Sequence, residues 1–238
     1  MHARPSHLVR ACKMTSAVLV GLTALVALGA TNGLDLTARL LLWKQQPHVE
    51  TTLKTIEPIL DRFGTWLLLI SAVAVTWMVR GRRVGLSAAL GVGIGWVVNN
   101  GLTTALKLLT ARNRARIGSP NMFEWGQVQL VDTHQWRLMA AYPSGHTGGA
   151  ALAGMCAWYL SSLWAAKARK PVRVVSIAVI VAVCAISWLR TTHWVTDIVA
   201  GVIVGWFSAS VGMMVAGKRL RAAGDADDSA RLTADSVA

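Results

Sequence analysis

Charged residues are scarce in this chain and are concentrated outside its long apolar runs. Only 15% of its 238 residues are charged, whereas 54% are hydrophobic, and a soluble domain usually carries about a quarter charged residues. The apolar residues form continuous blocks and not the one-sided stripes of a soluble helix. These features exclude an ordinary soluble domain and predict an integral membrane protein.

Other common signals are missing as well. The three cysteines, Cys12, Cys156 and Cys184, show no pairing pattern, so we expect free thiols that pack as small hydrophobic groups. The sequence has no internal repeat, no His/Cys cluster with metal-ligand spacing and no glycine-rich nucleotide loop. We therefore expect no metal and no cofactor. A transporter predicts paired half-repeats, and none is visible in the sequence.

The net charge of +13 has the sign that nucleic-acid binding requires. However, the basic residues lie in short clusters between apolar blocks, where they orient helices and contact anionic lipid head groups. The expected partners are therefore membrane lipids and not nucleic acid. The sequence carries no signal for an oligomeric state.

The hydropathy pattern predicts an all-α fold, a six-span transmembrane helical bundle over residues 14–217. It is flanked by a basic tail over 1–13 and by a basic tail over 218–238 that is expected to be disordered from 222. The first apolar run, 14–30, fits either a cleaved signal peptide or a retained helix extended to about residue 34, and the apolar residues at 40–43 favour the helix. The other spans are expected at about 63–79, 84–106, 146–166, 174–189 and 194–215.

The distribution of lysine and arginine predicts the orientation of the bundle. The N-terminal tail, residues 80–83, residues 167–173 and the C-terminal tail fall on one side, which the positive-inside rule makes cytoplasmic. Both termini are then cytoplasmic in a multi-pass protein of the cell membrane, and the loops 35–62, 107–143 and 190–193 face outside. Tryptophans near these outer ends, including Trp188 and Trp194, fit an interfacial belt.

Three polar clusters are predicted to meet at the outer face. The six-span layout places the end of the third span, the start of the fourth, the end of the fifth and the start of the sixth on that face. The first cluster contains Lys107, Arg112, Arg114 and Arg116, the second is Ser144-Gly145-His146, and the third contains Arg190, His193 and Asp197.

The first two clusters suit a phosphate group. Lys107 and Arg114 can bind it as a point charge and as a planar fork, respectively. Ser144 is predicted to cap the fourth span, so its hydroxyl and the following backbone N–H groups provide neutral donors for an anion.

The third cluster suits nucleophilic catalysis. His193 and Asp197 are four residues apart and share one face of a helix. The carboxylate can therefore hold one imidazole N–H and leave the other nitrogen free as a nucleophile. His146, across the pocket, is placed to protonate the departing oxygen.

The order Lys-x6-Arg, Pro-Ser-Gly-His and His-x3-Asp resembles the type 2 phosphatidic acid phosphatase (PAP2) superfamily over about residues 100–205, and the six-span layout resembles its membrane lipid phosphatase branch. The resemblance implies that His193 attacks phosphorus to give a phosphohistidine, with Asp197 supporting it and His146 acting as the acid. It also implies that no metal is required. The groups that it implies for holding the phosphate are Lys107, Arg114, Ser144 and Gly145.

Two positions depart from the family pattern. Ala115 follows Arg114 where the family usually has proline, which we expect to reduce only loop rigidity. Ser187 stands at the position of a family arginine, and Ile186 stands where the family has serine. Arg190 lies one helical turn after Ser187 on the same face, so we predict that Arg190 binds the phosphate instead.

Arg112 and Arg116 are interpreted as loop charges that touch lipid head groups, and they are alternative phosphate clamps if Arg190 does not reach. The sequence thus predicts a metal-independent membrane phosphatase acting on the phosphomonoester or diphosphate of a lipid, such as undecaprenyl diphosphate, phosphatidic acid or phosphatidylglycerophosphate. Two alternatives stay open: a lipid phosphotransferase of the same family, and a non-catalytic lipid-phosphate binding or translocation protein in which the change at Ser187 has disabled turnover.

Overall fold

The computed structural model describes residues 5–42, 47–110, 112, 141–190 and 192–235, and every regular element in these ranges is helical. The all-α prediction is confirmed. The helices are α1 (Pro5–Ala27), α2 (Asn32–Leu42), α3 (Pro47–Pro58), the π-helical segment η1 (Ile59–Gly64), α4 (Thr65–Arg80), α5 (Arg82–Thr110), α7 (Gly145–Ser161), α8 (Ala166–Leu189) and α9 (Val195–Asp235).

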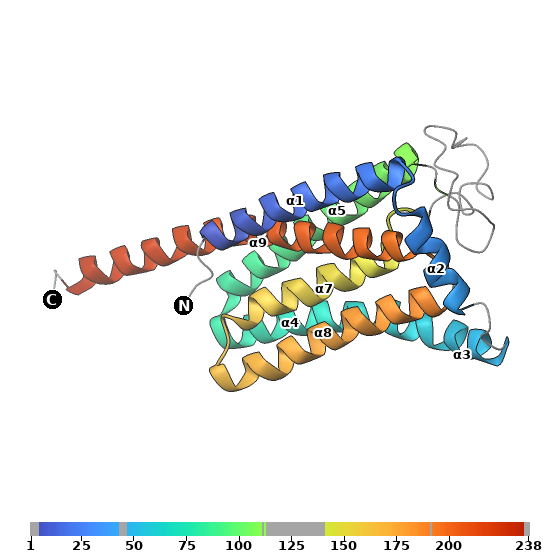
Figure 1. Cartoon of the computed structure of the whole chain (residues 1–238). Coiled ribbons are helices and arrows are strands. Elements are labelled where there is room, and N and C mark those ends of the chain that lie inside the picture. The colour runs from blue at the N-terminus through green and yellow to red at the C-terminus, as the bar shows by residue number, and fades with distance from the viewer. Residues whose placement is uncertain (1–4, 43–46, 111, 113–140, 191, 236–238) are drawn as a thin grey trace.

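Six of these helices, α1, α4, α5, α7, α8 and α9, form the predicted bundle (Figure 1). Within the described ranges, four segments are long and apolar enough to cross a membrane, namely Ser6–Ala27, Arg82–Thr110, Ala166–Leu189 and Val195–Gly217. The apolar helix α4 is shorter. Helix α7 has 17 residues, which at 1.5 Å each reach about 25 Å, slightly less than the roughly 30 Å hydrocarbon core. The predicted count of six full spans is therefore approximate.

Helix α7 runs through the middle of the bundle, with α4, α5, α8 and α9 around it (Figure 1). Most of its residues are small and buried. Small residues let helix backbones approach closely inside a membrane, where packing and not the hydrophobic effect drives association. Gly201 of α9 illustrates this, because a Cβ at that position would collide with the carbonyl of Ser144 and the hydroxyl of Thr147. The close approach of α9 thus fixes the position where α7 begins.

The two ends of the bundle differ in character (Figure 1). One end holds the start of α1, the end of α9, the turn between α4 and α5 at Gly81, and the turn between α7 and α8. The basic clusters 80–83 and 167–173 lie at this end. The other end holds α2, α3, the last turns of α5 and α8, and the starts of α7 and α9. The predicted alternation of the chain between two sides therefore agrees with the helix directions.

Two boundaries differ from the sequence predictions. Helix α1 begins at Pro5 inside the predicted 1–13 tail, and it ends before a turn at Gly29, which has a φ of +73°, and not near residue 34. Long side chains such as Arg10 and Lys13 can extend from a helix end towards head groups, so they are compatible with this earlier start. Helix α9 continues through Asp235, where a disordered tail was expected from 222. Five alanine residues between 222 and 235 favour a helix there.

Candidate active site

Residues from each of the three predicted clusters lie together at the end of the bundle that carries α2 and α3. Lys107 is in the last turn of α5, and a Cβ added to Gly145 would lie 3.9 Å from its Nζ atom. The ring centroids of His146 and His193 are 6.1 Å apart in an edge-to-face arrangement. One polar site is thus formed from the end of α5, the start of α7 and the junction of α8 with α9.

The start of α7 is held by hydrogen bonds to the start of α9. Ser144 is the N-cap residue, and its Oγ accepts a hydrogen bond from the N–H of Thr147 at 3.4 Å. The N–H of Ser144 donates to the carbonyl of Asp197 at 2.9 Å, and the hydroxyl of Thr147 donates to the carbonyl of Ile198 at 3.2 Å. The N-terminal N–H groups of α7, which suit an anion, are therefore held in a fixed position relative to His193.

His193 is 2% exposed, and its Nδ1 atom lies 2.9 Å from the carbonyl oxygen of Ala141. A carbonyl oxygen only accepts hydrogen bonds, so Nδ1 carries the proton and Nε2 keeps its lone pair. Burial lowers the pKa of His193, and the nearby carboxylate of Asp197 opposes that shift. His193 is therefore neutral near pH 7 and has the tautomer that a nucleophile at Nε2 requires.

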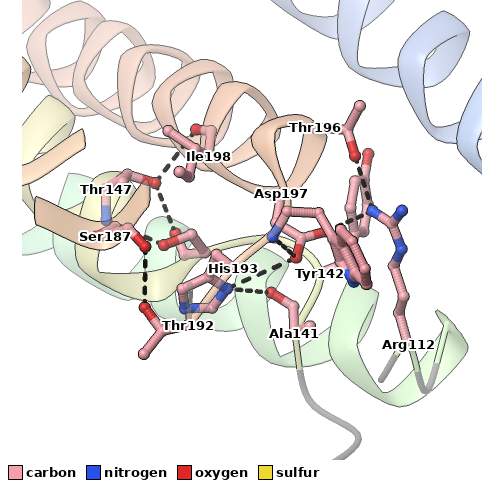
Figure 2. Close-up of polar contacts among 12 residues, drawn as sticks. Arg112, Ala141, Tyr142, Thr147, Ser187, Thr192, His193, Thr196, Asp197 and Ile198 are labelled. Atoms are coloured by element: carbon pink, nitrogen blue, oxygen red, sulfur yellow. Dashed lines mark hydrogen bonds and ion pairs between the residues drawn. The ribbon is translucent and has the colours of Figure 1, made fainter. Parts of the chain in front are cut away.

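Asp197 does not make the predicted hydrogen bond to the imidazole of His193. Its Oδ2 atom is 3.7 Å from Nδ1 of His193, which is an ion-pair distance and too long for a hydrogen bond. The same oxygen accepts the backbone N–H of Trp194 at 3.0 Å, and Oδ1 accepts a hydrogen bond from Arg112 at 2.6 Å. The carbonyl of Ala141 thus fixes the tautomer, and Asp197 places a negative charge beside the ring (Figure 2).

Arg112 and Asp35 form a buried network that the sequence analysis missed. Arg112 is 1% exposed and pairs with both Asp35 and Asp197, so its interpretation as a loop charge at lipid head groups is wrong. Trp194, assigned to an interfacial belt, is 2% exposed, and the guanidinium carbons of Arg112 and Arg39 each lie 5.7 Å from its ring centroid. One feature of the sequence could have indicated this network, namely Asp35, an acidic residue shortly after an apolar run.

The other predicted phosphate ligands are placed less directly. Arg190 follows the last residue of α8 and forms an ion pair with Glu57 of α3, with each side chain 13% exposed. Ser187 is buried, and its Oγ atom has no hydrogen-bond partner within the part of the chain that the structure describes. Arg114, Ala115 and Arg116 lie outside the described residues. The roles predicted for Arg190 and Arg114 therefore remain predictions.

A cavity of about 140 Å³ adjoins the start of α7. It lies between α4, α5 and α7, and its walls combine aromatic, aliphatic and amide side chains. Within it, Asn99 Oδ1 and Thr65 Oγ1 are buried without a partner among the described residues. The lining residues are Thr65, Trp66, Leu69, Trp96, Asn99, Asn100, Gly145, Gly149 and Leu152.

A helical membrane bundle with a buried histidine–carboxylate pair and a lysine at converging helix ends defines a class of multi-pass membrane proteins with an internal polar site. The family model of the PAP2 superfamily matches residues 85–221, which is more than half of the chain. The chain therefore belongs to the PAP2 superfamily, and the resemblance drawn from its three motifs is confirmed.

The fold is also similar to a solved structure. The crystal structure of the transmembrane PAP2-type phosphatidylglycerolphosphate phosphatase from Bacillus subtilis aligns with a TM-score of 0.62 and 19% sequence identity, covering 88% of this chain and 96% of that chain. No curated protein matches the sequence. At this identity the similarity concerns the fold, and it supports the arrangement of helices described above.

Proposed function

We propose that this protein is an integral membrane phosphatase that removes a terminal phosphate from a lipid phosphomonoester or diphosphate through a phosphohistidine at His193. The observation that carries the proposal is the state of His193. Its Nδ1–H is directed to the carbonyl of Ala141 at 2.9 Å, so the lone pair on Nε2 is available for nucleophilic attack, and the ring centroid of His146 lies 6.1 Å from that of His193. Membership of the PAP2 superfamily supports the reaction class.

In the proposed reaction, Nε2 of His193 forms a bond to phosphorus while the bond from phosphorus to the lipid oxygen breaks. His146 donates a proton to that departing oxygen. The imidazole gains a positive charge when Nε2 bonds to phosphorus, and the Asp197 carboxylate at 3.7 Å stabilises that charge. Water then attacks the phosphohistidine, with His146 now accepting the proton, and inorganic phosphate leaves.

Binding of the phosphate is assigned to groups that offer positive charge or N–H donors, and this makes a metal unnecessary. The proposed phosphate ligands are Lys107, Arg114, Ser144, Gly145 and Arg190.

A lipid substrate is supported by the cavity beside Gly145. Trp66, Trp96 and Leu69 provide apolar walls, and the helices that carry them belong to the membrane-embedded bundle. The part of a lipid next to its phosphate can occupy this space while the phosphate reaches the start of α7. The solved structure similar in fold is that of a phosphatidylglycerolphosphate phosphatase, so glycerolipid phosphates and polyprenyl diphosphates are the first substrates to assay. The positive-inside rule supports a site on the extracytoplasmic side.

The proposal is tested by measuring phosphate release from purified protein against a panel of lipid phosphates, with and without EDTA. We expect release by the wild type and by His7→Ala, a histidine control at the opposite end of the bundle, and at least a 1000-fold loss in His193→Ala, which removes the nucleophile. A radiolabelled phosphoenzyme that is acid-labile and base-stable should form only when His193 is present.

The same assay separates the alternatives. Substrate binding without release in the wild type indicates a lipid-phosphate binder. Transfer of the label to an added alcohol in preference to water indicates a phosphotransferase. Loss of activity with EDTA contradicts the metal-free part of the proposal.

A further inference from the structure

We propose that Asp35 and Arg112 are positioning residues for His193, acting through Asp197: Arg112 divides its positive charge between two buried carboxylates, and Asp35 thereby sets how much negative charge Asp197 presents to the imidazole. This inference rests on the proposed function for its catalytic meaning. The network itself is defined by contacts between α2, the residue Arg112 and the start of α9.

Arg112 is the centre of the network. Its Nη1 atom donates to Oδ1 of Asp197 at 2.6 Å and to the hydroxyl of Thr196 at 2.7 Å, and its Nη2 atom donates to Oδ2 of Asp35 at 2.7 Å. Arg112 and Asp35 are each 1% exposed, and Asp197 is fully buried. Buried charges are costly unless they are paired with good geometry, and Arg112 is paired with both carboxylates.

Asp197 is fixed through both of its oxygens. Oδ1 is held by Arg112, and Oδ2 accepts the backbone N–H of Trp194 at 3.0 Å. Trp194 precedes the first residue of α9 and Asp197 is the third residue of the helix, so this bond is the return half of a capping box. In Figure 2 the carboxylate lies between the guanidinium of Arg112 and the ring of His193. The hydrogen bond from Arg112 therefore helps to fix the orientation of the Asp197 carboxylate towards His193.

Asp35 completes the network from α2. Its Oδ1 atom accepts the backbone N–H of Thr196 at 3.1 Å, and its Oδ2 atom accepts the hydroxyl of Thr196 at 2.7 Å. A carboxylate at the first turn of α9 also interacts favourably with the helix dipole. Two carboxylates against one guanidinium leave one negative charge in the network. That negative charge stabilises the positive charge that the imidazole gains when Nε2 bonds to phosphorus and the lipid oxygen departs.

The charges around His193 act in opposite directions. His146 of α7 and Lys107 of α5 disfavour a positive ring, as burial does, whereas Asp197 favours it. Arg112 contacts Asp197, and Asp35 contacts Arg112. Both residues therefore act on the pKa of His193 indirectly, through Asp197. The Arg190–Glu57 pair, from the end of α8 and from α3, is neutral as a unit. Replacing Asp35 by asparagine keeps its size and removes one negative charge, so the pKa of His193 must fall.

The experiment measures the pKa of His193 directly, by NMR of histidine-labelled protein in detergent, with His193→Gln to assign the signal. Asp35→Asn should lower this pKa by roughly half a unit or more, the size expected for one charge removed across two contacts. Arg112→Lys keeps the charge but not the fork that spans two carboxylates, so we expect the pKa to stay near the wild-type value. Arg82→Gln, at the other end of the bundle, is the matched control for removal of a charge.

Turnover gives the second readout. We expect Asp35→Asn to shift the acid limb of kcat/KM to lower pH, and Arg112→Lys to lower kcat about ten-fold with the limb unmoved. An unchanged His193 pKa in a folded Asp35→Asn protein overturns the inference, because a purely structural role does not move the pKa in one defined direction. If the wild type releases no phosphate, the proposed function fails while the NMR titration still tests the network.

Discussion

At the residue scale, His193 combines a fixed tautomer with a suppressed positive charge. The carbonyl of Ala141 holds the proton on Nδ1, and burial lowers the pKa of the ring despite Asp197. An ordinary surface histidine is about half protonated near its usual pKa of about 6.5. His193 therefore stays neutral over a wider acidic range than such a residue.

This residue-scale property predicts the pH dependence of turnover. The nucleophile must be neutral, and a lowered pKa means that protonation begins only at lower pH, so the acid limb of kcat/KM should lie below about pH 6.5. The measurement is kcat/KM against pH with two lipid phosphates whose own phosphate pKa values differ. A limb that stays at the same pH for both belongs to the enzyme, and a limb that moves with the substrate contradicts its assignment to His193.

At the scale of elements, the contact between α7 and α9 is the part of the fold that sets the site. Gly201 lies in α9 against the first turn of α7, and Ser144, Gly145 and His146 all depend on where that turn is held. Gly201→Ala places a methyl group too close to the hydroxyl of Thr147 and the carbonyl of Ser144, so the first turn of α7 must shift away from α9.

We expect Gly201→Ala to reduce kcat at least ten-fold, because a displacement of about 1 Å at catalytic groups is enough for such a loss. Gly217→Ala, on the same helix with no atom within 4 Å of the added methyl, is the control and should keep wild-type kcat. Phosphate release by the two purified variants, compared at equal amounts of folded protein, checks this. Wild-type kcat in Gly201→Ala contradicts the role given to the contact.

The elements also show what hydropathy and motif spacing can predict. The six apolar helices follow from hydropathy. The convergence of Lys107, His146 and His193 follows from chain direction, because successive spans run in opposite directions and their ends alternate between the two sides. The contacts of Asp35 do not follow from it. They depend on the turn at Gly29, which directs α2 across the start of α9, and on a hydrogen bond to Thr196 that joins residues 161 positions apart.

At the scale of the whole molecule, charge is distributed unevenly along the bundle. The basic clusters 80–83 and 167–173 lie at the end with the start of α1 and the end of α9, whereas the candidate active site lies at the other end (Figure 1). A lysine or arginine cluster next to a span is retained in the cytoplasm. This arrangement predicts that α3 and the active site face outside and that the α4–α5 turn faces the cytoplasm.

Cysteine labelling tests this orientation. The three native cysteines are replaced by alanine, and single cysteines are introduced as Lys54→Cys, exposed on α3, or as Arg82→Cys, exposed at the start of α5. In intact cells, a membrane-impermeant maleimide should label the Lys54→Cys protein and should label the Arg82→Cys protein only after the membrane is permeabilised. The opposite pattern places the active site in the cytoplasm, and the positive-inside assignment is then wrong. Labelling of both variants in permeabilised cells is the internal control, because each introduced thiol must react once the reagent can reach it.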